Sequence, residues 1–178
     1  EHDRGLALLQ AGKDSGLFEE IEAFGAEAEE IFIRLGDVEN QARARGLIGS
    51  VLWWRGETEA AGTHLEGSLE LISDRLESAV GAEALIGKAS YLWRTGRSLE
   101  SEVVIDQARS IVERYGDVRT RMHMLSVHAG NLLAMGDPSG NELNEQVLNM
   151  ALDRGESAQA ASAYNNLVTH QLFFDHVG

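Results

Sequence analysis

One spacing of 40 residues recurs along the chain and constrains its fold more than any other feature of the sequence. The stretch "SVLWWRGE", which begins at Ser50, returns in part as "SYLWRTGR" from Ser90. Glycines share this register at four positions, Gly16, Gly56, Gly96 and Gly136. A fixed period of this length is the signature of a repeat protein, in which equivalent modules stack on their neighbours.

A second glycine series runs half a period out of phase with the first. It lies in "RLGD" at 34–37, "RYGD" at 114–117 and "DRGE" at 153–156, whereas Leu76 occupies the equivalent position in the second repeat. Glycine favours the left-handed backbone that ends a helix, and an aspartate after it is a good N-cap for the next helix. We therefore expect a helix to end near each glycine, and we expect N-caps at Asp37, Asp117 and Asp137.

The segments between these breakers have the length and apolar spacing of helices. Small and apolar residues at helical spacing form one stripe, which in the second unit comprises Ala61, Leu65, Ser68, Leu69 and Ile72. The chain has a single proline, and this composition also favours helices. The predicted helices cover residues 3–14, 18–35, 39–55, 57–74, 79–95, 98–115, 119–135, 139–154 and 158–174.

These helices predict an all-α fold in which antiparallel helix pairs stack into one α-solenoid domain over residues 1–178. A single pair cannot bury its own apolar stripe, so each pair must pack against the next one. The expected units cover about 1–36, 37–76, 77–116 and 117–155, followed by a half unit at 156–178. Because the chain begins without methionine, we expect it to be a piece of a larger protein.

This pattern resembles tetratricopeptide repeats, which carry small residues at fixed positions of both helices. Here those positions hold Gly49, Ala89 and Ala129, then Ala61 and Ser101, then Ala28, Ser68 and Ala108. The resemblance implies a right-handed superhelical stack of about nine helices. Three features depart from the family: the period exceeds the usual length of about 34 residues, Leu9 takes the small position of the first unit, and Asn141 and Glu145 are atypical in the fourth.

The long 40-residue form is similar to the helical regions of bacterial signalling ATPases and of LuxR-type or cyclase-linked regulators. The stretches "GDP" at 137–138 with its preceding glycine and "AYNNL" at 163–167 contribute to this likeness. The likeness implies a bacterial cytoplasmic protein with a role in signal transduction or transcription regulation. In such a parent protein, contact with DNA would belong to another domain.

Composition and motifs argue against several classes of function. The formal net charge of −14 disfavours binding of nucleic acid or an anionic membrane surface. The chain has no cysteine, which excludes disulfides and thiolate metal sites and fits a cytoplasmic location, and no stretch is long and apolar enough for a membrane span. The histidines lack metal-binding spacing and no nucleotide-binding or hydrolase motif is present, so we expect no enzyme activity, metal or cofactor.

In the family, the first helix of each unit lines a concave groove. Carried over, the groove positions predict a partner-binding surface of Arg43, Ser50, Trp53, Trp54, Glu83, Ser90, Trp93, Arg94, His123, Asn165 and Thr169. Tryptophan and arginine are frequent binding hot spots. An alternative stays open for Trp53 and Trp93, which could instead pack between units as core residues. Trp54 has no counterpart in the other repeats and is therefore the stronger candidate for a contact.

We therefore expect a non-enzymatic scaffold that binds a peptide, a helix or a neighbouring domain in its groove. The alternative is a small-molecule sensor whose ligand lies against the tryptophans and Arg94. The last predicted helix lacks its partner, so its apolar residues Leu167, Leu172, Phe173 and Phe174 could pair two copies of the chain as a homodimer.

Overall fold

The computed structural model describes the backbone of residues 1–174, and the side chains of residues 1–157 and 159–168. This part of the chain is all-α and confirms the predicted fold class. Its nine helices are α1 (His2–Asp14), α2 (Phe18–Leu35), α3 (Val38–Trp54), α4 (Thr58–Leu71), α5 (Ala79–Arg94), α6 (Ser98–Tyr115), α7 (Val118–Ala134), α8 (Ser139–Arg154) and α9 (Ser157–Phe174).

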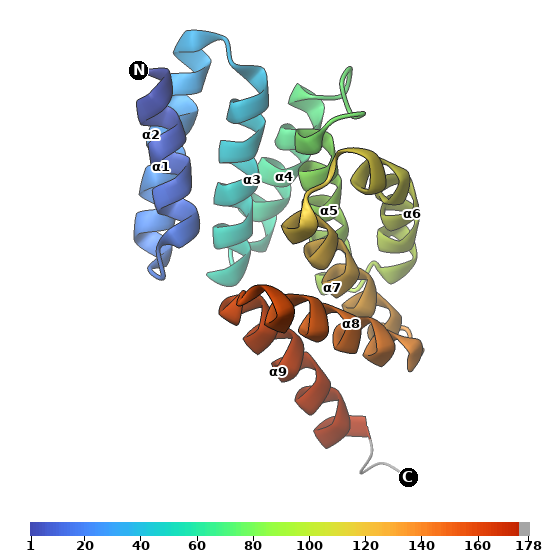
Figure 1. Ribbon diagram of the computed structural model, residues 1–178. Coiled ribbons are helices and arrows are strands. Elements are labelled where there is room, and N and C mark those ends of the chain that lie inside the picture. Colours follow the sequence, from blue (N-terminus) through green and yellow to red (C-terminus); the bar gives the residue numbers. More distant parts are fainter. Residues whose placement is uncertain (175–178) are drawn as a thin grey trace.

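The helices stack in sequence order, with the first and last at opposite ends of the molecule (Figure 1). Each helix packs against the next one along the chain, except that α1, α3, α5, α7 and α9 also contact one another in that order. We call this row the A layer. The B layer comprises α2, α4, α6 and α8, which pack against A helices but, within residues 1–174, not against one another. Helices of the first and third units are likewise not packed together in this part of the chain, as a solenoid requires.

Most of the predicted breakers end helices in the expected way. Five glycines, Gly36, Gly56, Gly96, Gly136 and Gly155, have a left-handed backbone with φ between 66° and 84°. The prediction was wrong for Gly16 and Gly116, which keep a negative φ. At Gly116 the backbone is extended, with φ −76° and ψ 137°, so α6 ends by straightening into the next loop.

The second unit shows what the missing glycine changes. Helix α4 ends at Leu71, three residues before the predicted end at 74, because Leu76 offers no left-handed stop. Residues 72–78 instead form a turn and an irregular segment, and the Ser78 hydroxyl accepts a hydrogen bond from the Gly81 N–H to cap α5. The predicted caps Asp37 and Asp117 accept from the backbone N–H groups of residues 40 and 120.

Small residues bring the two helices of a unit close together. A Cβ atom added to Gly49 on α3 would lie 2.8 Å from Cγ of Leu65 and 3.2 Å from the Ala61 carbonyl oxygen of α4. In the next unit the buried Ser101 hydroxyl of α6 donates to the Ala89 carbonyl of α5 at 2.9 Å. The small positions that carry the family resemblance are therefore sites of tight helix packing.

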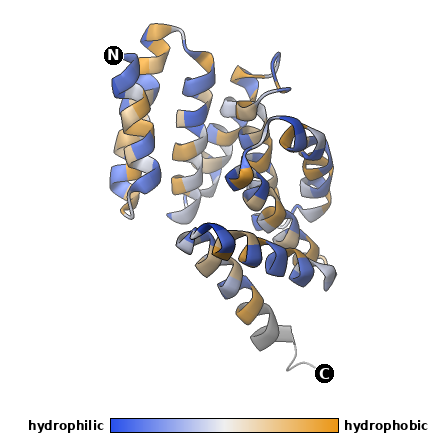
Figure 2. Ribbon diagram, viewed as in Figure 1, coloured by the Kyte–Doolittle hydropathy of each residue, from blue (hydrophilic) through white to orange (hydrophobic). Residues whose placement is uncertain are grey.

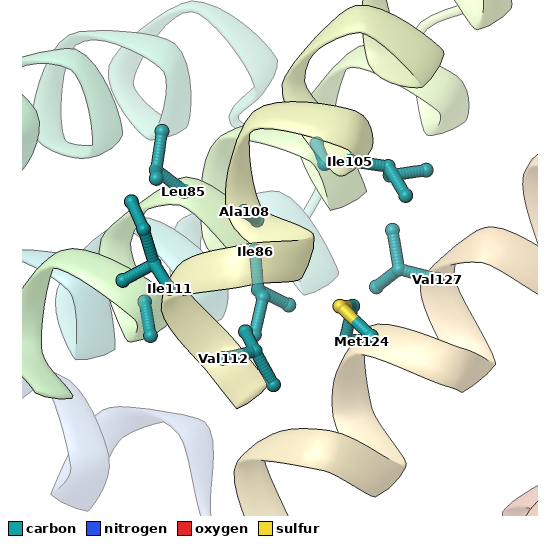
Figure 3. Packing of buried hydrophobic residues seen from close by; sticks show 10 residues of the cluster. Leu85, Ile86, Ile105, Ala108, Ile111, Val112, Met124 and Val127 are labelled. Atoms are coloured by element: carbon teal, nitrogen blue, oxygen red, sulfur yellow. The ribbon is translucent and has the colours of Figure 1, made fainter. Parts of the chain in front are cut away.

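The apolar core runs continuously between neighbouring units. Figure 2 shows hydrophobic and hydrophilic residues alternating along each helix, as expected for helices with one packed face. In the largest cluster, Ile86 of α5, Ile105 and Val112 of α6, and Met124 and Val127 of α7 point toward one another (Figure 3). The third unit is therefore joined to the fourth by shared core residues. None of the helices within residues 1–174 has the length and apolar character of a membrane span.

The close packing of α3 on α4 predicts opposite effects for two glycine substitutions on one helix. Replacing a helical glycine by alanine adds about 1 kcal/mol of helix propensity. At Gly46 the nearest atom to the new Cβ is the Ser68 hydroxyl oxygen at 3.8 Å, so we expect Gly46→Ala to stabilise by about 0.5–1 kcal/mol. At Gly49 the new atom overlaps Leu65, and we expect a net loss of about 1–3 kcal/mol.

Urea unfolding followed by circular dichroism measures both variants under the same conditions. Gly46→Ala is the matched control, because it changes the same residue type one turn earlier on α3. Equal free energies of unfolding for the two variants would contradict the close approach at Gly49.

Candidate binding cavity

A cavity of about 260 Å³ opens on the A layer where α3 and α5 pack together. The last turn of α3 and the second half of α5 supply most of its wall, α4 contributes one buried leucine, and α7 contributes a histidine. Its lining residues are Ser50, Trp53, Trp54, Leu65, Gly87, Ser90, Tyr91, Arg94 and His123. Six of these nine belong to the partner-binding surface predicted from the sequence.

The guanidinium group of Arg94 is the charged centre of this cavity. Its central carbon lies 4.3 Å from the ring centroid of Trp53 and 5.0 Å from that of Trp54. The two indole rings themselves meet edge to face, with centroids 5.0 Å apart and an interplanar angle of 79°. Contacts of this kind between a cation and an indole face contribute about 0.5–2 kcal/mol, more when the cation is desolvated. The tryptophans therefore hold Arg94 in place as well as lining the cavity.

Arg94 differs from most other arginines of the chain in having no carboxylate partner among the described residues. Arg43 and Arg45 of α3, for example, pair with glutamates at 3.2 and 2.6 Å. The hydrogen bond described for Arg94 runs from Nε to the Ser90 hydroxyl at 3.2 Å. Burial lowers the pKa of the Arg94 guanidinium, but arginine remains charged at neutral pH. The cavity thus contains a partly desolvated positive charge without a compensating negative one.

The three tryptophans divide between the two interpretations that the sequence left open. Trp54 is 59% exposed and lines the cavity, as expected of a contact residue. Trp53 does both, because it is half-buried against the core of α3 and α4 and also lines the cavity. Trp93 packs between units: it joins the core cluster of α5–α7, and a Cβ added to Gly130 of α7 would lie 2.9 Å from its ring.

His123 approaches the cavity from α7. The residue is exposed, yet it lies in a concave part of the surface with protein atoms on several sides. That crowding, followed by the positive charge of Arg94, lowers the pKa of the imidazole below its ordinary value of 6.5. At pH 7 the ring is therefore neutral and adds one N–H donor and one acceptor to the cavity.

The remaining predicted residues lie elsewhere. Arg43 of α3 and Glu83 of α5 do not line the cavity; they form an ion pair with each other across the two helices. Asn165 is exposed on α9 and is also absent from the lining. The side chain of Thr169 lies outside the described residues, as do those of Leu172, Phe173 and Phe174, whereas Leu167 is half-buried.

Three lining residues were missing from the prediction. Leu65 belongs to a B helix, which the sequence pattern assigned to the core, and it is indeed almost fully buried. Gly87 and Tyr91 lie on α5 beside the predicted positions Ser90 and Arg94. Their one-turn spacing from these residues could have indicated that they share the same face.

No family model and no curated protein matches this chain. The functional argument therefore rests on the arrangement of residues in the cavity.

The proximity of Arg94 predicts how His123 titrates. We expect NMR titration of the ring protons to give a pKa below 6.5 in the native chain. Arg94→Gln removes the positive charge and should raise that pKa part of the way toward 6.5, because the crowding remains. Arg43→Gln removes an arginine that is paired with Glu83, and it should leave the titration of His123 unchanged. A native pKa at or above 6.5 would contradict this description of the site.

Proposed function

We propose that this chain is a non-enzymatic interaction module that binds a segment of a protein partner across its A layer. In this proposal the tetratricopeptide-like stack is the sensor or docking region of a bacterial cytoplasmic signalling or transcription-regulating protein. The partner is a peptide, a helix or a neighbouring domain of the same parent chain. The stack presents its surface already folded, so binding requires little ordering of the module.

One observation carries this proposal: an exposed indole and a partly desolvated arginine without a carboxylate partner meet in one hollow of the A layer. Tryptophan and arginine dominate binding energy at protein interfaces, most of all where a pocket excludes water around them. A stable monomer gains little from leaving an indole 59% exposed. The cost of such a residue is readily explained by its use in a contact.

The size of the cavity favours a side chain over a larger ligand. Pockets for drug-sized molecules measure roughly 300–1,000 Å³ and enclose most of the ligand. The present cavity, at about 260 Å³, is smaller and holds one amino-acid side chain comfortably. A protein segment can place one residue in it and extend over the neighbouring helices α3, α5 and α7.

A second candidate function is a sensor for a small metabolite, which the same arrangement of Trp53, Trp54 and Arg94 supports. A ligand stacked on these rings would change their intrinsic fluorescence directly. Saturable quenching by one member of a metabolite panel, with an affinity that falls in Trp54→Ala, would favour the sensor.

The interaction module predicts that one exposed tryptophan controls partner affinity. Peptides selected from a random library on the 178-residue chain would be measured again by fluorescence anisotropy. We expect Trp54→Ala to weaken the selected peptides at least about tenfold, which corresponds to about 1.4 kcal/mol. Because Trp54 is exposed, its removal should change the free energy of unfolding by less than about 0.5 kcal/mol.

Leu99→Ala is the matched control for Trp54→Ala. Leu99 is a large apolar residue that is 78% exposed, but it lies on α6 of the B layer. We expect this variant to bind the selected peptides as the native chain does. Peptides that bind both variants equally well would contradict a binding surface on the A layer.

A further inference from the structure

The hydrogen-bonding groups of the cavity have a polarity that identifies the chemistry of its ligand. Arginine carries five N–H donors and no acceptor. At Arg94 the Nε–H is directed to the Ser90 hydroxyl, whereas the flat faces of the guanidinium meet indole rings. Stacking uses the faces of the group and leaves its N–H edge available. The terminal nitrogens of Arg94 have no hydrogen-bond acceptor among the described side chains.

The neighbouring polar groups extend this donor surface. Because the Ser90 oxygen accepts from Arg94, its own O–H is left to donate. Neutral His123 offers one N–H. Ser50 already donates its hydroxyl to the Gly46 carbonyl at 2.9 Å. No acidic residue lines the cavity. The missing component is therefore an acceptor with negative charge.

The charge of the site matches one carboxylate. A carboxylate carries a single negative charge and two oxygens, which fit the two parallel N–H bonds of one guanidinium. A phosphate group carries close to two charges at neutral pH and is commonly held by several cations or backbone N–H groups. Arg94 is the only lysine or arginine among the residues that line the cavity. The indoles of Trp53 and Trp54 supply an apolar wall for the methylene stem that carries the carboxylate.

The rest of the chain sets a second condition on the partner. With 29 acidic and 15 basic side chains, the module repels segments that are acidic overall. A segment that binds must therefore combine an acidic residue at the cavity with positive charge around it.

We propose that the cavity receives the side-chain carboxylate of one aspartate or glutamate from a protein segment that is otherwise basic, with Arg94 as its ion-pair partner. This inference rests on the proposed function and specifies its partner. The carboxylate binds to the N–H edge of Arg94, and its stem lies against the tryptophans. The flanking basic residues lie over the acidic surface of the module.

The test uses the complete 178-residue chain and random 12-residue peptides whose carboxyl ends are fused to a carrier, so that only side chains can supply a carboxylate. Peptides that bind the native chain but not Trp54→Ala are kept and sequenced. Each acidic residue in them is then replaced by its amide. A double-mutant cycle measures the affinity of both peptide forms for the native chain and for Arg94→Gln. Arg94→Lys, which keeps the charge without the fork of donors, is measured beside it as a second variant.

We expect the kept peptides to share one acidic residue among basic ones. Its replacement by the amide should weaken binding to the native chain at least tenfold, and binding to Arg94→Gln less than threefold. Arg94→Lys should bind with intermediate affinity. Circular dichroism of each variant would establish that it is folded. Kept peptides whose affinity does not depend on an acidic residue would overturn the carboxylate inference and leave the interaction module standing.

If no peptide depends on Trp54, the proposed function itself fails, and a second arm identifies the source of the carboxylate. This arm titrates the chain with 3-phenylpropionate and with its neutral amide, 3-phenylpropanamide, and follows the tryptophan indole signals by NMR. Binding of the acid alone, lost in Arg94→Gln, would assign the cavity to a free small carboxylate and overturn the protein segment as its source. Absence of binding by both compounds would overturn the inference altogether.

Discussion

Close approach between the two helices of each unit is the constraint on which the rest of the structure depends. It sets the spacing of the stack because a small residue on one helix meets a small residue on the other. These pairs are Gly49 with Ala61, Ala89 with Ser101, and Ala129 with Gly140. In the last pair a Cβ on Gly140 would lie 2.5 Å from the Ala129 carbonyl oxygen, so even alanine is too large there. Bulkier residues would move the helices apart and change the angle of every following unit.

The same contact explains why the repeat slips by one residue in the fourth unit. The sequence pattern places the small position of α8 at Asn141, which made that unit look atypical. In the structure Gly140 occupies the crossing, because the turn around Pro138 is one residue shorter than its counterparts. The interval between Gly116 and Gly155 is accordingly 39 residues instead of 40. The packing contact is preserved and the chain length adjusts to it.

The sequence was sufficient to place the helices because their ends depend on local chemistry. Glycine stops and aspartate caps act within a few residues, and only α4 departs by more than one residue from its predicted end. The candidate site was less predictable because it depends on neighbouring units. The register of 40 residues placed Trp54 and Arg94 on one surface. Whether Trp93 faced the cavity or the core depended on Gly130 of the next unit, which leaves room for its ring.

Function in such a stack is expected where the repeat is broken, because the repeated residues are already committed to packing. Trp53 and Trp93 are equivalent in the repeat, and both have core contacts. The next residue along is Trp54 in one unit and Arg94 in the other, and this position departs from the pattern without any requirement of the fold. The departure places an indole and a guanidinium side by side, 5.0 Å apart. An acidic chain that only had to fold would pair that arginine with a glutamate, as it does at Arg43. Leaving the charge uncompensated keeps its donors for a partner.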